Sequence, residues 1–390
     1  MIRPGSATPP PQPITPEEAR QFLVGHHGLA RRELPRGAAG VRALLVKLRC
    51  IQLDPLDMLG TNADLVALAR LDGIARGDVY RHLLPGHAFE HFAKERCLLP
   101  ASAFPYYRAH AVDAPWFRRT SRVARVGDQV IAAVLEEVQQ SGPITAADLT
   151  HHGHVEPLDW HGWKSTARAT SMALDVLWAR CQIVVCGRSG RGKLFDVPER
   201  ALPEVAGLPA GDFGRWALLE RVEAAGLLAR RGGAHWSMLD DVRKSSLPDQ
   251  LLSEGLLEEV QLPGSPRTWL APQGFRDRRH KPVDDRLRIL GPLEPMIWDR
   301  ELVKQAFGFE YIWEVYKPAA ARRWGWYVVP LLHRGQLVGR MEAAVEGDSL
   351  RVKKVWREEG RVFDDAAFEE ALLRHAKACG VEKVKLPRRR

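Results

Sequence analysis

The 390-residue sequence predicts an α+β fold in which helical units precede a C-terminal β-rich domain. Two stretches predict the helical units, because each has helix-forming patterns that end in two short strands joined by a glycine-containing turn. The later part of the chain predicts the β-rich domain. There, apolar runs alternate with turn signals such as Arg334-Gly335 and Gly347-Asp348, as expected of neighbouring strands.

The composition is typical of a globular protein with a basic bias. Hydrophobic residues make up 45% and charged residues 27%, and the formal net charge of +9 favours a polyanionic partner. Five cysteines without a CxxC pair indicate a reducing compartment and argue against a zinc ribbon. No apolar run reaches the length needed to span a membrane. We expect a cytoplasmic monomer that needs no cofactor and does not contact membranes.

The N-terminal region predicts a disordered leader at residues 1–13 and a helical, winged-helix-like domain at 14–126. Thr15-Pro16-Glu17-Glu18 has the residues of a helix N-terminus: a capping threonine, proline in the first turn, and acids near the positive end of the helix dipole. The expected helices are 16–26, 40–47, 62–71 and 78–84.

The next stretch, 127–205, has the order of a winged helix. We expect helices at 129–140, 146–149 and 166–179, followed by strands at 182–186 and 193–197. The hairpin tip would present Arg188, Arg191 and Lys193 for contacts with DNA phosphates. An α+β protein with a basic turn remains the alternative.

A second winged helix is predicted at 206–275, again with helices followed by a hairpin whose turn contains Pro263-Gly264. Residues 276–390 form the predicted C-terminal β-rich domain. Its strands are followed by a closing helix at 364–379, a last strand at 381–386 and a basic tail.

The candidate catalytic segment follows the helix predicted at 40–47. In an extended chain, alternate side chains share a face, so Ile51 and Leu53 would anchor in a core while Gln52 and Asp54 project together. Pro55 restricts the backbone of Asp54. An amide beside a carboxylate is suited to holding and deprotonating a water molecule. The alternative is a helix end followed by an ordinary turn.

Other motifs give no competing chemistry. His151, His152, His154 and His161 match no zinc-binding spacing, so we expect no metal site. The sequence contains neither a Walker motif nor GxSxG.

Several segments together resemble the YcaQ-like, AlkZ-related winged-helix DNA glycosylases that repair crosslinks. The Arg49–Asp54 segment resembles the catalytic motif of that family in its Gln-apolar-Asp form. The helix and hairpin of 174–203 are also similar. The strongest similarity lies in three C-terminal segments: 290–300, 307–318 and 322–330.

The resemblance implies tandem winged helices and hydrolysis of the N-glycosidic bond of alkylated or crosslinked purines in double-stranded DNA. The resemblance also implies catalytic roles: Gln52 would position the water and Asp54 would activate it. We expect Arg322 and Arg323 to bind DNA together with the cations of the basic hairpin. Phe92-Ala93-Lys94 stands where the family has Trp-Ala-His. The sequence thus predicts a monofunctional DNA glycosylase, with a non-catalytic winged-helix DNA-binding protein or regulator as the alternative.

Overall fold

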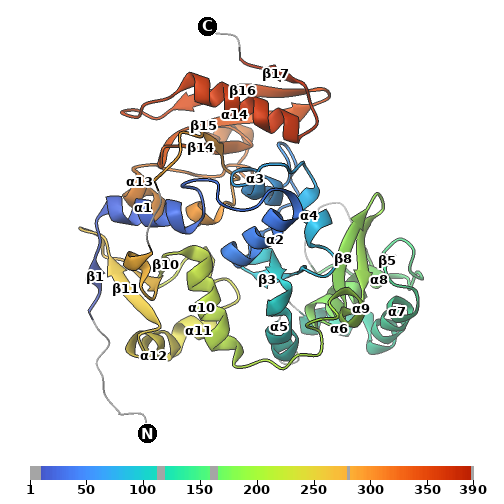
Figure 1. The fold of residues 1–390 in the computed structure, drawn as a ribbon. Coiled ribbons are helices and arrows are strands. Elements are labelled where there is room, and N and C mark those ends of the chain that lie inside the picture. Colours follow the sequence, from blue (N-terminus) through green and yellow to red (C-terminus); the bar gives the residue numbers. More distant parts are fainter. Residues whose placement is uncertain (1–9, 112–118, 159–165, 279–281, 388–390) are drawn as a thin grey trace. The chain divides into compact units, whose positions relative to one another are not determined.

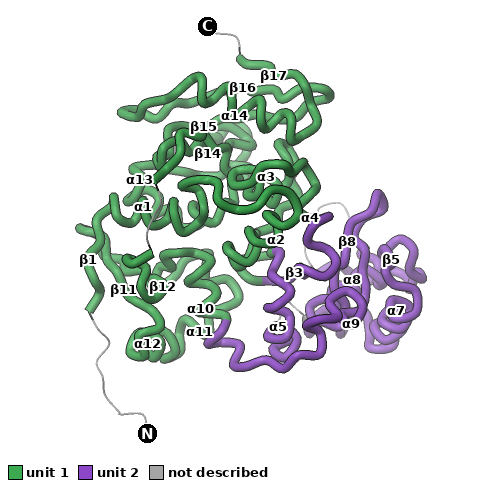
Figure 2. Tube along the Cα trace, viewed as in Figure 1, with its two compact units in different colours: residues 1–79, 93–97, 217–390 green, residues 80–92, 98–216 purple. Residues whose placement is uncertain are grey.

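The computed structural model describes residues 10–111, 119–158, 166–278 and 282–387 (Figure 1). Figure 2 shows its division into two compact units. Unit 1 contains residues 1–79, 93–97 and 217–390, and unit 2 contains residues 80–92 and 98–216. Helices and sheets occur in both units, which confirms the α+β class.

Two of the first three helices of unit 1 begin where predicted, at Pro16 and Asn62. The second helix begins at Gly37 instead of Gly40, and the third ends at Leu68 instead of Leu71. Thr15 caps the first helix and forms a reciprocal capping box with Glu18. A second capping box joins Thr61 and Asp64 at the start of the third helix. The helices are α1 (Pro16–His26), α2 (Gly37–Leu48) and α3 (Asn62–Leu68).

One sheet of unit 1 has the strand order β1-β11-β12-β10. Its outermost strand contains Gln12 and Pro13, the last residues of the predicted leader, which pair in parallel with β11. The expected hairpin at 256–270 is present as β11 and β12. The elements of this region are β1 (Gln12–Pro13), α10 (Phe213–Ala225), β10 (Leu228–Ala229), α11 (Asp240–Lys244), α12 (Leu247–Ser253), β11 (Leu257–Gln261) and β12 (Thr268–Pro272).

The C-terminal part of unit 1 is a five-stranded sheet of order β13-β14-β15-β16-β17. Leu331, Met341 and Leu350 from this sheet share a core with Leu372 of the closing helix, because the helix turns its apolar side to the sheet. The prediction of strands and a closing helix is confirmed. Its elements are β13 (Arg288–Ile289), α13 (Arg300–Phe307), β14 (Val328–His333), β15 (Gln336–Glu346), β16 (Ser349–Arg357), α14 (Asp365–Ala378) and β17 (Lys383–Lys385).

The first four residues of α10 belong to unit 2, and three short elements also lie where the chain passes between the units. They are α4 (Asp78–Leu83), β3 (Ala88–Ala93) and β4 (Glu95–Pro100). In unit 1, the candidate catalytic segment contributes β2 (Ile51–Gln52), which pairs with β4.

Unit 2 contains a basic hairpin preceded by helices. The strands β8 and β9 form the hairpin, and the unforeseen β5 pairs with β9. The helix expected at 146–149 is wrong, since those residues form a turn directly after β5. The elements are α5 (Phe104–Ala111), α6 (Arg119–Val126), α7 (Asp128–Ser141), β5 (Ile144–Thr145), β6 (His154–Val155), β7 (Ala167–Arg168), α8 (Ala169–Ala179), β8 (Val184–Ser189), β9 (Gly192–Asp196) and α9 (Pro198–Ala201).

Two sequence interpretations extend beyond these observations. The tandem winged-helix interpretation and the four predicted domain boundaries remain predictions. His161 of the histidine cluster and residues 388–390 of the basic tail lie outside the described residues.

Candidate active site

Gln52 lies in β2, which is separated from the end of α2 by Arg49 and Cys50. The backbone leaves the helix through Arg49, which has a positive φ of 64°. The adjacent strand then holds the segment, because Leu53 N donates to Arg96 O at 2.8 Å. Ile51 is fully buried and anchors β2 from one side, as predicted. Gln52 is itself buried, with 6% of its surface exposed.

Asn62, the first residue of α3, supports the backbone of Gln52. Its Nδ2 donates to Gln52 O at 2.8 Å, and its Oδ1 accepts from Leu293 N at 3.2 Å. A Cβ at Gly291 would lie 2.5 Å from the same Oδ1, so only glycine permits this close approach. The 290–300 segment therefore helps to fix the position of Gln52.

Lys94 fixes the side-chain amide of Gln52. Its Nζ donates to Gln52 Oε1 at 2.8 Å and lies 5.4 Å from the ring centroid of Trp298. An ammonium group only donates, so this contact assigns the oxygen of the amide to Lys94 and directs Nε2 the other way. Burial lowers the pKa of Lys94, and the nearby cations Arg300 and Arg221 act in the same direction.

Asp54 differs from Gln52 in its surroundings. Its carboxylate is half-buried, and its Oδ1 accepts from Leu56 N at 2.8 Å, which closes a local turn around Pro55. Within the described residues Asp54 forms no ion pair. Burial raises the pKa of Asp54, while the hydrogen bond from Leu56 N opposes that shift.

The predicted alternation of this segment holds only in part. Leu53 is less buried than Gln52, whereas the sequence pattern places Leu53 in the core and Gln52 outside it. The difference arises because Lys94 and Asn62 satisfy the polar groups of Gln52, which makes its burial possible. Gln52 and Asp54 thus have separate hydrogen-bond partners.

The cations of the basic hairpin in unit 2 form ion pairs with carboxylates of the same unit. Arg188 and Lys193 both contact the buried carboxylate of Glu90, the latter at 3.3 Å, and Arg188 also lies over the ring of Tyr80. Arg191, at the turn, pairs with Asp148 but is mostly exposed.

Arg322 and Arg323 precede β14 in unit 1. Arg322 Nε donates to Lys317 O at 2.8 Å, whereas Arg323 is exposed and lies 3.3 Å from Glu310. Arg323 also covers one face of Trp324. The assignment of these arginines and of the hairpin cations to DNA contacts remains a prediction.

Comparison with known proteins decides the family. The model of the family described as "DNA glycosylase AlkZ-like" matches residues 45–378, a range that includes Gln52, Asp54 and Lys94. The chain belongs to the AlkZ-like DNA glycosylase family.

A solved structure is similar over nearly the same length. The fold resembles that of the DNA glycosylase AlkZ from Streptomyces sahachiroi, with a TM-score of 0.62 and 16% sequence identity. The match covers 96% of this chain and all of the AlkZ chain. The resemblance noted in the sequence is confirmed, and membership of the AlkZ-like family identifies a DNA repair glycosylase that binds DNA as its substrate.

Lys94, like Asn62, is a residue of this AlkZ-like site that sequence reasoning left without a role. The only signal was its position where the family has histidine; its contact with Gln52 joins residues 42 positions apart in the chain. Spacing does not reveal such a contact, because it depends on how β4 pairs with β2.

No metal or membrane feature was found in the described part of this AlkZ-like chain. Within the described ranges, no three His, Cys, Asp or Glu side chains are grouped to hold a metal ion. Among the same residues, no helix is both long and apolar enough to cross a membrane. All five cysteines are free thiols.

Proposed function

We propose that this glycosylase hydrolyses the N-glycosidic bond of alkylated purines, including those in interstrand crosslinks, as a cytoplasmic monomer that needs no cofactor. The observation that carries the proposal is the state of Asp54: a half-buried carboxylate that forms no ion pair within the described residues. A carboxylate neutralised by an arginine would be a poor base and a poor partner for a developing cation.

The chemistry requires a negative charge beside the sugar. An alkylated purine leaves readily because it is already cationic, and its departure gives the sugar oxocarbenium character. Asp54 stabilises that positive charge and accepts a proton from the attacking water. A general acid for the leaving base is less important, since the base departs as a neutral molecule.

Gln52 positions the water in this proposal. Since its Oε1 accepts from Lys94, its Nε2 is the group free to donate to a water oxygen. A water that accepts from Gln52 and donates to Asp54 has a lone pair left to attack the sugar. Lys94 acts as a positioning residue, because it prevents the amide from turning over.

The DNA contacts are part of the same proposal. Two winged helices, at 127–205 and 206–275, would follow the N-terminal domain at 14–126. Arg188, Arg191, Lys193, Arg322 and Arg323 would contact phosphates, with Arg191 and Arg323 the most accessible.

The decisive experiment uses the wild-type protein and three duplexes of one sequence: unmodified, carrying N7-methylguanine, or carrying an N7-linked interstrand crosslink. Heating in alkali after the reaction cleaves abasic sites and reveals excision. We expect product from the modified duplexes alone. Binding to all three duplexes without product would overturn the proposed reaction.

A further inference from the structure

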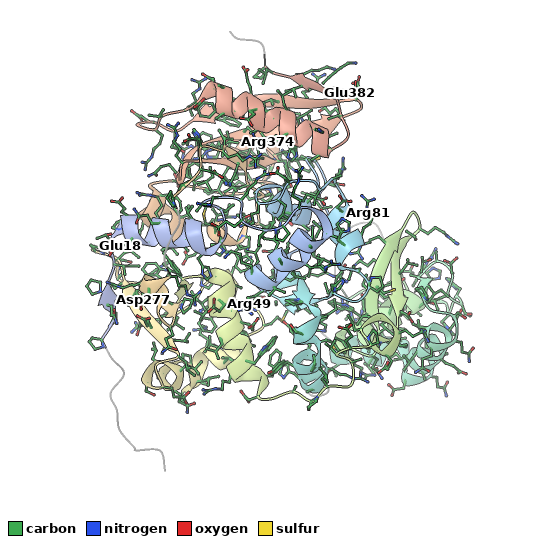
Figure 3. All side chains as sticks on the ribbon, viewed as in Figure 1. Glu18, Arg49, Arg81, Asp277, Arg374 and Glu382 are labelled. Carbon is green, nitrogen blue, oxygen red and sulfur yellow. The ribbon has the colours of Figure 1, made fainter. Side chains whose placement is uncertain are left out.

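A cavity of about 470 Å³ in unit 1 is lined by basic side chains from three separate parts of the chain. Arg32 and Arg36 come from the segment between α1 and α2, and Arg288 comes from β13. Arg374, labelled in Figure 3, and Lys377 project from α14. The volume is in the range of pockets that take small ligands. We call this cavity the basic pocket.

Some of the cations are held rigidly at its wall. Arg288, which is 3% exposed, makes two hydrogen bonds of 2.7 Å to the two carboxylate oxygens of Asp284. Arg32 pairs with Asp72, which also accepts from Arg286 at 3.1 Å. The Nε atoms of Arg32 and Arg288 are buried and have no hydrogen-bond partner among the described residues. Donors of this kind are costly to leave unsatisfied.

Within the described residues, two other cations at the pocket lack an acidic partner, whereas Arg374 pairs with Glu370. The side chains of Arg36 and Lys377 are exposed and make no hydrogen bond or ion pair within the described part of the chain. Burial lowers the pKa of Arg32 to about 9, and Arg286, Arg288 and Arg374 reinforce that shift. Asp284 opposes this shift, and Asp72 and Asp78 also line the pocket. The guanidinium groups still repel one another, and a bound anion would relieve that repulsion.

We infer that the basic pocket is a binding site for a phosphate group. Guanidinium groups match the oxygens of phosphate in geometry, and converging arginines are the usual means of holding one. Two sources share this chemistry: a backbone phosphate of DNA and a free phosphorylated small molecule such as a nucleotide. The apolar wall that includes Leu68, Leu287 and Ile289 leaves room for a sugar or base beside the phosphate.

The pocket is separate from the proposed catalytic groups but lies one short helix from them. α3 begins at Asn62, which contacts Gln52, and ends at Leu68, which lines the pocket. Seven helical residues span roughly 10 Å. The inference does not require Gln52 or Asp54 to be catalytic. Phosphate binding could therefore be disproved while the proposed reaction stands, and the proposed reaction could be disproved while phosphate binding stands.

The first measurement is calorimetric titration of the full-length protein with inorganic phosphate and with deoxyadenosine 5′-monophosphate, in chloride buffers of constant ionic strength. The test variant is Arg36→Gln/Lys377→Gln, because both side chains are exposed and unpaired and their loss leaves the packing intact. The control, Lys354→Gln/Lys385→Gln, removes the same charge from exposed positions outside the pocket. We expect saturable binding to the wild type and control, and affinity about tenfold lower or worse in the test variant.

A second measurement identifies the source of the phosphate. If it is the DNA backbone, inorganic phosphate competes with a fluorescent duplex, and the salt dependence of duplex binding falls by about one unit in the test variant, because one phosphate contact is lost. Unchanged duplex binding in the test variant, with loss of nucleotide binding, identifies a free phosphorylated ligand. Equal affinities of the test and control variants for phosphate, nucleotide and duplex would overturn the inference.

Discussion

The candidate catalytic segment of unit 1 and the basic hairpin of unit 2 both carry charged residues singled out from the sequence, but these residues have opposite surroundings in the fold. Asp54 is half-buried and has no cation beside it within the described residues. Arg188, Arg191 and Lys193 each contact a carboxylate of their own unit. The sequence does not show which charged residues form ion pairs. The structure shows that the hairpin cations are paired with carboxylates, whereas the carboxylate of Asp54 is not paired within the described residues and is available for chemistry.

The comparison has a physical consequence for each region. An unpaired, half-buried carboxylate has a raised pKa and an electric field that little else neutralises. A paired cation must exchange a protein carboxylate for a DNA phosphate, so it gains less on binding than a free one. The predictions below test this contrast, from the largest expected effect to the smallest.

The largest effect should come from Asp54→Asn, which keeps the size of the side chain but removes its charge. We expect excision of N7-methylguanine to fall by roughly two to four orders of magnitude, the range for losing a positioned acid–base group. Single-turnover kinetics would measure it, with duplex affinity measured in parallel and expected to stay near that of the wild type.

Asp57→Asn is the matched control. Asp57 lies three residues away but pairs with Arg76 at 2.6 Å on the surface, where such pairs contribute about 1 kcal/mol or less. Its excision rate should equal that of the wild type. Wild-type activity in Asp54→Asn would refute the proposed mechanism, whatever the control shows.

A smaller effect, about ten- to a hundredfold in rate, is expected from Lys94→Met, because it frees the amide of Gln52 to turn over. Gln52→Ala should cost a similar amount. If Lys94 acts only through Gln52, the double variant should be no slower than Gln52→Ala alone. Single-turnover rates of the four proteins complete the cycle; additive losses would contradict the positioning role.

Lys94→Arg is an informative companion variant. It retains a donor for Gln52 Oε1, so it should recover part of the rate lost in Lys94→Met. Circular dichroism and thermal melts of each variant would exclude unfolding as the cause of a lost rate.

The hairpin should show effects of several-fold in DNA affinity. Replacing Arg188, Arg191 and Lys193 with alanine should weaken binding to every duplex about equally and reduce the salt slope by roughly one unit per lost contact. Glu90→Gln tests the pairing itself, because it removes the carboxylate charge that pairs with Arg188 and Lys193. Without that charge, the two cations should bind DNA more tightly.

Anisotropy titrations at several salt concentrations would measure both effects. Arg191→Ala is a control for stability, because its side chain is mostly exposed. Unchanged affinity and salt slope in the triple variant would remove the hairpin from the DNA interface.

The smallest effect concerns pH. Because burial raises the pKa of Asp54, excision should decline on acidification at a higher pH than for an exposed aspartate, whose pKa is about 3.9. A raised carboxyl pKa also means that the charged form destabilises the fold at neutral pH. Asp54→Asn should therefore melt at the same or a slightly higher temperature at pH 7, and this gain should vanish as the pH falls through the raised pKa. A melting temperature below that of the wild type at pH 7 would contradict this.

Local chemistry determined much of the fold from the sequence alone. The capping box at Thr15 and Glu18 fixed the start of α1, and the turns at Arg334-Gly335 and Gly347-Asp348 separated the strands of the C-terminal sheet. These features depend on residues close together in the chain, so the pattern contains the information. The helix expected at 146–149 failed because β5 pairs with the distant strand β9.

The candidate site could be located from sequence but not assembled from it. The Gln-apolar-Asp pattern pointed to Gln52 and Asp54, and the family match includes both positions. Only the tertiary structure brought Lys94 to Gln52, Asn62 to Gly291 and Glu90 to the hairpin cations. Each of these contacts joins residues far apart in the chain, and burial decides their strength because it removes the water that would otherwise satisfy the same groups.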